Sequence, residues 1–240
     1  MNIRVGMENG FEGHALAWML DFPGCFVAAE NDLAVRVKLE EAVRNYADWI
    51  ARHETATWFD AHDIQINIEE TWQCYTIDEL FEPVPEGKEG YEVNAWFRHD
   101  WKPLTQQDIE RGIKLLDWSR QDFLQVIGKL DSHALDYHPP GERWSIEGII
   151  RHVGIAEWWY LDRFDRACPY ETLPTEPMEI VYKSRQCLLA LLPELENKSL
   201  VIGVVGEFWS PRKLLRRAVW HERDHTQHIQ KLLNQYRTHE

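Results

Sequence analysis

The chain has 240 residues, of which 26 are basic and 40 acidic, so its net charge at neutral pH is −14. This charge argues against a protein that binds nucleic-acid phosphates, because such proteins present a basic face. Hydrophobic residues make up 44% of the chain, enough for a substantial core, yet no run reaches the roughly 18 apolar residues of a membrane span. We therefore expect neither a nucleic-acid partner nor a membrane one.

The four cysteines are dispersed, and none forms a C-x-x-C pair. This pattern is typical of reduced thiols in a cytoplasmic protein. The first residues, Met1–Gly6, lack the apolar run of a secretory signal peptide. The expected location is therefore the cytoplasm.

The first part of the chain predicts a small α+β domain. Residues 14–20 and 25–29 are apolar and flank a Pro-Gly turn signal at 21–24, which indicates two strands joined by a turn. Apolar residues recur at helical spacing over 35–50. Isoleucines alternate with polar residues over 64–68, as expected for a half-buried strand.

The Asp-x-Pro-Gly-Cys segment at 21–25, followed by a helix that carries Glu40-Glu41-Ala42, resembles the HicB-like antitoxin domain. The resemblance covers roughly residues 1–75, and we place the domain at 1–82. It implies that this domain binds a small protein toxin. In the family a DNA-binding segment usually follows, and none is recognised after this domain here.

Residues 83–102 predict a linker, because prolines and glycines recur there among acidic residues. Its aromatic side chains (Tyr91, Trp96, Phe97 and Trp101) indicate that it packs against another part of the chain.

From residue 103 to residue 240 the pattern predicts four helices. The first begins near Thr105, the second after its cap Ser145 and the third after Thr175. Four amphipathic helices favour an all-α bundle, and bundle cores commonly hold metal sites on facing helices. The expected fold class is thus α+β, with an all-α bundle after the N-terminal domain.

The fourth helix is capped by Ser210, with Pro211 in the first helical position. Its apolar stripe includes His221 and His225, which lie one above the other on a helix. Inward-facing polar groups need partners, because an unsatisfied one costs ~1–3 kcal/mol. A shared metal ion would satisfy both; the alternative is two core histidines bonded to carbonyl groups.

The same helix starts with four basic residues, Arg212, Lys213, Arg216 and Arg217. We interpret them as a solvated face, with contact to an anionic substrate as the alternative.

Residues 221–225 also match H-E-x-x-H, in which the glutamate of zinc proteases is the general base. A protease is the weaker hypothesis, because these enzymes take their third ligand downstream and the extended pattern fails here. His152, the single histidine of the second helix, is the natural third ligand. Three histidines leave one tetrahedral position open, as in catalytic zinc sites, but imidazole also suits Ni, Cu and Fe.

Several motifs together resemble the DinB/YfiT-like superfamily: Trp144-Ser145-x-x-Gly148-Ile149-Ile150-x-His152-x-x-x-x-Glu157, Trp209-Ser210, and His221-x-x-x-His225 before Gln227-His228-Ile229. The resemblance covers roughly residues 103–240. It implies a four-helix bundle that binds a divalent metal, Zn or Ni, through His152, His221 and His225. It also implies a thiol-dependent S-transferase or isomerase, and a homodimer formed through the bundle.

A metal-bound thiol is deprotonated, and the thiolate is the reactive nucleophile. Glu157 or Glu222 is then a candidate catalytic base, or orients a ligand imidazole; the alternative for both is a solvated helix carboxylate. The leading hypothesis is a metal-dependent thiol S-transferase whose partners are a small thiol and a small electrophile. The alternatives are a HicB-like binding module with a structural or sensory metal, which a fourth ligand from His228 would favour, and a metal-dependent hydrolase.

Overall fold

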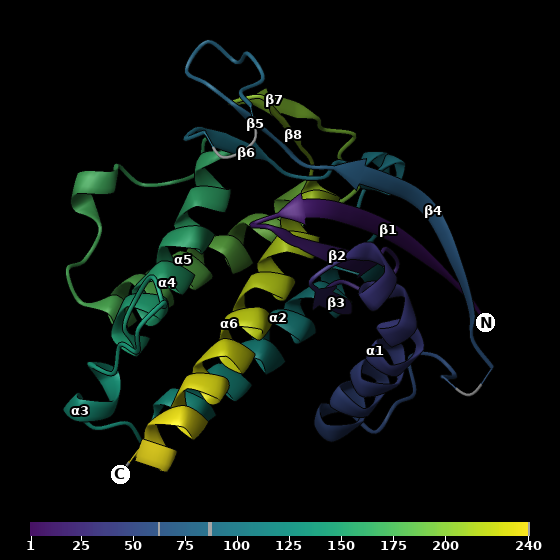
Figure 1. The fold of residues 1–240 in the computed structure, drawn as a ribbon. Helices are drawn as coiled ribbons and strands as arrows, with labels where there is room; N and C mark the ends of the chain where they lie inside the picture. Colours follow the sequence, from purple (N-terminus) through teal and green to yellow (C-terminus); the bar gives the residue numbers. More distant parts are fainter. Residues whose placement is uncertain (62, 86–87, 240) are drawn as a thin grey trace. The chain divides into compact units, whose positions relative to one another are not determined.

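A computed structural model describes residues 1–61, 63–85 and 88–239 (Figure 1). The chain divides into two compact units. Unit 1 consists of Met1–Pro103 and Ser199–Arg216, and unit 2 consists of Leu104–Lys198 and Arg217–Glu240. Among the described residues, no helix is both long and apolar enough to cross a bilayer.

Unit 1 is built on a four-stranded sheet with strand order β3-β2-β1-β4. β1 pairs antiparallel with β2 and parallel with β4, and β2 pairs antiparallel with β3. Helix α1 connects β3 to β4 and contacts β2 and β3. The bounds are β1 (Asn2–Phe11), β2 (His14–Met19), β3 (Phe26–Ala29), α1 (Asp32–His53) and β4 (Gln65–Gln73).

The strands predicted near 14–20, 25–29 and 64–68 and the helix predicted over 35–50 are present. Strand β1 was not predicted, although Ile3, Val5 and Met7 occupy every second position. The Glu8 side chain is fully buried, and its carboxylate accepts hydrogen bonds from the Trp18 indole N–H (2.8 Å) and from the backbone N–H of Ala95 (2.6 Å). A buried carboxylate with such partners is compatible with a strand interior.

The structure differs from the linker predicted at 83–102, since these residues belong to unit 1. β5 (Tyr75–Ile77) pairs antiparallel with β6 (Tyr91–Val93), and the 3₁₀ helix η1 (Arg98–Trp101) follows. Phe97 is buried against Gly6, where a Cβ atom would lie 2.7 Å from the Phe97 ring. Burial of the Phe97 ring thus attaches this segment to the rest of unit 1. Residues 86 and 87 lie outside the described part of the chain.

The remaining part of unit 1 contains β7 (Ile202–Val204), β8 (Glu207–Trp209) and the start of α6 (Pro211–His239). The solvated basic face predicted on α6 is wrong. All four of its side chains are buried: Arg212, Lys213, Arg216 and Arg217. Lys213 pairs with Glu207 (3.4 Å) and Arg216 pairs with Asp100 (2.8 Å), so carboxylates compensate the charge that burial would otherwise penalise.

Unit 2 contains the long helices of the predicted bundle, and its part of α6 runs beside the others (Figure 1). The predicted caps are confirmed: the Thr105 hydroxyl accepts a hydrogen bond from Asp108 N–H (3.2 Å), and the Ser145 hydroxyl accepts one from Gly148 N–H (3.2 Å). The helical elements of this unit besides α6 are α2 (Gln106–Ile127), α3 (Ser132–Leu135), α4 (Ile146–Asp162), η2 (Tyr170–Thr172), α5 (Pro177–Leu191) and η3 (Leu192–Leu195).

The core of unit 2 is formed by apolar residues from all four long helices. α4 and α5 approach closely at Gly154, where a Cβ atom would lie 2.8 Å from the backbone nitrogen of Val181. This core holds α4 and α6 with their histidines facing each other.

Candidate metal centre

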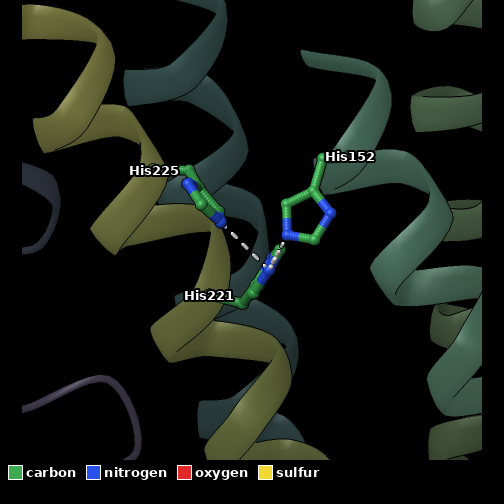
Figure 2. Close-up of side chains that lie close together, drawn as sticks. All are labelled: His152, His221 and His225. Atoms are coloured by element: carbon green, nitrogen blue, oxygen red, sulfur yellow. Dashed lines mark hydrogen bonds between the residues drawn. The ribbon is translucent and has the colours of Figure 1, made fainter. Parts of the chain in front are cut away.

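Three histidine side chains converge inside unit 2. His221 and His225 lie one turn apart on α6, and His152 comes from α4 (Figure 2). The Nε2 atom of His221 lies 3.0 Å from Nε2 of His152 and 3.1 Å from Nε2 of His225. Within the described ranges, this is the one group of three potential metal ligands, and its ligand atoms all lie within 4.8 Å of one another. The structure thus brings the three predicted ligand residues together.

All three imidazoles are neutral at neutral pH. Burial, together with the nearby Arg143 guanidinium, lowers the pKa of His152 to about 4. Burial also lowers the pKa of His225 to about 3, with smaller contributions from His152 and His228 once these are protonated at low pH, and it holds the pKa of His221 well below the usual value. Each ring therefore keeps one nitrogen lone pair, as a metal ligand must.

The hydrogen-bonding pattern favours a shared cation. A neutral imidazole carries one N–H, so a single proton on His221 Nε2 could serve only one of its two neighbours. A zinc ion bound at 2.0–2.1 Å in tetrahedral geometry would hold its nitrogen ligands about 3.3 Å apart, close to the two short separations here. The residues present therefore fit a divalent cation, with Nε2 as the ligand atom of each ring.

The far sides of two rings lack the support that metal-binding histidines usually have. The Nδ1 atoms of His221 and His225 are buried and have no hydrogen-bond partner in the described part of the chain. Ligand histidines usually donate this N–H to a carboxylate or a carbonyl oxygen. Packing of aromatic rings holds the imidazoles instead, with Trp220 edge-on to His221 at 5.6 Å.

The ring of His152 is held by Trp144. The two rings stack with centroids 4.4 Å apart and planes at 24°, and the Arg143 guanidinium lies over the Trp144 ring, also at 4.4 Å. Gly148 leaves the space for this arrangement, since a Cβ atom there would lie 2.9 Å from Cβ of Trp144. The Trp-Ser-x-x-Gly motif thus has a physical basis in the placement of His152.

Glu157 and Glu222, the predicted catalytic carboxylates, lie in a buried ion-pair network. Glu222 accepts hydrogen bonds from Arg120 Nε (2.5 Å), the Ser119 hydroxyl (2.8 Å) and Arg185 (2.8 Å). Glu157 pairs with Arg185 through Nε (2.9 Å) and with Arg120 (3.5 Å). Both carboxylates are at most 2% exposed, so the alternative interpretation of solvated helix carboxylates is wrong.

The same network weakens Glu222 as a base. Burial raises the pKa of Glu222. The charges of Arg185 and Arg120 and their hydrogen bonds lower it by a larger amount, so that the pKa of Glu222 lies below the usual value. A carboxylate held in its ionised form by two guanidinium groups is a poor proton acceptor. Catalytic roles for Glu157 and Glu222 stay predictions, and their contacts favour a part in holding the helices together.

His228 does not join the cluster. Its Nε2 atom lies 3.0 Å from the Glu142 carboxylate, and the ring of His228 is 6.2 Å from that of His225. The described part of the chain thus supplies three ligands.

The arginines of the network were missed by the sequence analysis, although the sequence carries a signal. Arg120 occupies a core-facing helical position between the buried residues Leu116 and Phe123. Arg185 occupies the corresponding kind of position between Val181 and Leu188. Charged residues on an apolar stripe need buried partners, and such a partner had to come from another helix.

One family model matches within this region. Residues 115–229, which include all three histidines, match the family model of the DinB superfamily. One similar structure is YfiT from Bacillus subtilis, described as a probable metal-dependent hydrolase with an unusual four-helix bundle topology. The two sequences are 17% identical over an alignment that covers 55% of this chain and 89% of the YfiT chain, and the TM-score is 0.44. Another is TT2238, a four-helix bundle protein that is 19% identical to this chain. That alignment covers 51% of this chain and 98% of the TT2238 chain, with a TM-score of 0.42. No curated protein matches the chain.

Proposed function

We propose that this protein binds a divalent metal ion, zinc or nickel, on His152, His221 and His225, and that it transfers a small thiol to a small electrophile. The observation that carries the proposal is the convergence of three neutral imidazoles through their Nε2 atoms. The match of this region to the DinB superfamily agrees with it.

Three protein ligands suit catalysis better than a purely structural site, because structural zinc sites are usually closed by four protein ligands. When bound, a divalent metal lowers the pKa of a thiol in the remaining coordination position, so that the reactive thiolate is present at neutral pH. The sulfur would form the new bond to the electrophilic carbon while the bond from that carbon to its leaving group breaks, as with the chloride of 1-chloro-2,4-dinitrobenzene, and the thiol proton would pass to solvent. The chain's own part is to bind and orient: Trp144 fixes the ring plane of His152.

Thiol transfer is favoured over hydrolysis by the arginine contacts of the two carboxylates, although burial raises the pKa of Glu157 above its usual value. Attack by water commonly uses a positioned carboxylate as general base, and both Glu157 and Glu222 are bound by arginines. A coordinated thiol loses its proton without such a base. Hydrolysis by metal-activated water is therefore the alternative enzyme activity.

A second candidate function, suggested by the HicB-like pattern, is a protein-binding module in unit 1 with a structural metal in unit 2. Leu33 and Val37 favour it, because these apolar side chains lie one turn apart on α1 and are 73% and 75% exposed. In this case the metal would be needed for folding rather than for turnover.

The test is turnover by the full chain after loading with Zn²⁺ or Ni²⁺ and after chelation. Glutathione with 1-chloro-2,4-dinitrobenzene reports thiol transfer, and 4-nitrophenyl acetate reports hydrolysis. Metal-dependent conjugation by wild type and by His228→Ala, but not by His221→Ala, supports the proposal. Ester hydrolysis without conjugation supports the hydrolase, and loss of the helical circular dichroism on chelation supports the structural metal.

A further inference from the structure

We propose that Arg143, seated on Trp144, binds an anionic group of the ligand, so that this centre takes small acids whose carboxylate lies several bonds from the metal-binding atom. The inference rests on the proposed metal site and deepens it, because it assigns a substrate class and a specificity residue.

The geometry places a fixed positive charge beside the ligand set. The guanidinium carbon of Arg143 lies 4.4 Å from the centre of the Trp144 ring, and that ring lies 4.4 Å from the ring of His152. Trp144 therefore contacts both the Arg143 guanidinium and the His152 imidazole. A guanidinium that uses its flat face on an aromatic ring keeps its N–H edge for a bidentate contact with a carboxylate.

Arg143 has no anionic partner in the described part of the chain. The adjacent carboxylate, Glu142, is bound to His228 instead, at 3.0 Å. Arg143 is exposed, unlike Arg120 and Arg185, whose charges are paired with buried glutamates. Its guanidinium is thus accessible to a ligand from solvent.

The net charge of the centre also favours an anion. The three proposed ligands are neutral imidazoles, so a divalent ion would keep its full charge. Two arginines lie near the histidines: Arg143 lies over Trp144, which stacks on His152, and the Arg217 guanidinium lies 4.5 Å from the ring of Trp220, which is edge-on to His221. In a chain with a net charge of −14, this is a local positive region, and such regions attract anionic ligands.

The spacing indicates the size of the ligand. The guanidinium carbon of Arg143 lies 4.4 Å from the Trp144 ring and that ring lies 4.4 Å from the His152 ring, so these two distances together set the largest span between the guanidinium and the imidazole. An extended peptide covers about 3.3–3.6 Å per residue, so a ligand of two to three residues in length, or an alkyl chain of similar reach, can span them.

The experiment uses the full chain loaded with Co²⁺ and two thiols of equal length, 6-mercaptohexanoate and 6-mercaptohexanamide. Binding is followed by the thiolate-to-cobalt absorption band. We expect wild type to bind the acid at least ~10-fold more tightly than the amide, because hydrogen bonds between charged groups are stronger than those to a neutral amide. Arg143→Gln should bind both thiols equally and keep the wild-type affinity for the amide, and Arg143→Glu should prefer the amide.

The matched control is Arg166→Gln, which removes one exposed positive charge paired with Glu194 at 3.1 Å and should keep the preference for the acid. An equal affinity of wild type for both thiols, or a preference that persists in Arg143→Gln, overturns the inference and leaves the metal site standing. Failure of the chain to bind Co²⁺ overturns the proposed function as well. Co²⁺ binding without binding of either thiol overturns thiol transfer together with this inference.

Discussion

His221 Nε2 lies 3.0 Å from His152 Nε2, although 69 residues separate the two histidines in the chain. Both rings are neutral, so the contact is between two nitrogen atoms that can share at most one proton, while His225 approaches the same nitrogen of His221. A divalent cation bound to all three Nε2 atoms removes the need for His221 to share one proton with two neighbours.

Removal of one partner from the buried network should be strongly destabilising. Replacement of Glu222 by Gln removes one charge of a compensated set and leaves the buried Arg120 with only its longer contact, 3.5 Å, to Glu157. We expect a loss of about 3–5 kcal/mol in the free energy of unfolding, as for other buried pairs that lose one partner. Urea unfolding of the metal-free protein measures this loss.

The control is Arg44→Gln, which breaks the exposed pair of Arg44 with Glu40 on α1. Exposed pairs contribute about 0–1 kcal/mol, so this variant should unfold like wild type. A Glu222→Gln variant as stable as Arg44→Gln would contradict a supporting role for the network.

Close packing of α4 on α5 gives a second prediction. A Cβ atom at Gly154 would lie 2.8 Å from the backbone nitrogen of Val181, which can move only if a helix moves. Gly154→Ala should therefore lower the free energy of unfolding by about 1–3 kcal/mol. Gly203→Ala is the matched control, because its Cβ atom would make ordinary contacts of 3.8 Å; equal stability of the two variants would show that the helices do not approach as described.

The stability of the metal-free protein should depend on pH through the histidines. Folding lowers the pKa of His152 from 6.5 to about 4 and that of His225 to about 3, so the unfolded chain takes up protons first as the pH falls. The free energy of unfolding is then highest above pH 6.5 and decreases as the pH falls toward 4. We expect each histidine to contribute about 1–2 kcal/mol of this decrease between pH 7.5 and pH 5.

The comparison is with the double variant His152→Gln/His225→Gln, in which these two contributions are absent and His221 remains buried. Urea unfolding of both proteins between pH 7.5 and pH 5 should give a shallower decrease for the variant. Parallel curves would mean that the two imidazoles are not buried in neutral form.

The helices of unit 2 and the three histidines could be predicted from the sequence, because caps and apolar spacing are local signals. Thr105 and Ser145 carry their cap pattern within four residues. The place of the segment around Phe97 could not be predicted, because it depends on contact with Gly6, far away in the chain. For the same reason Lys213 and Arg216 were interpreted as solvated, since nothing local identifies Glu207 and Asp100 as their partners.

The central claim is tested most directly by the metal content of the purified chain after incubation with Zn²⁺ or Ni²⁺. The set is wild type, the single alanine variants of His152, His221 and His225, and His228→Ala as the matched histidine control, all checked for folding by circular dichroism. The account predicts about one ion per chain in wild type and in His228→Ala, and loss of the ion in each of the three ligand variants. Folded wild type without metal, or ligand variants that retain it, would contradict the three-histidine site.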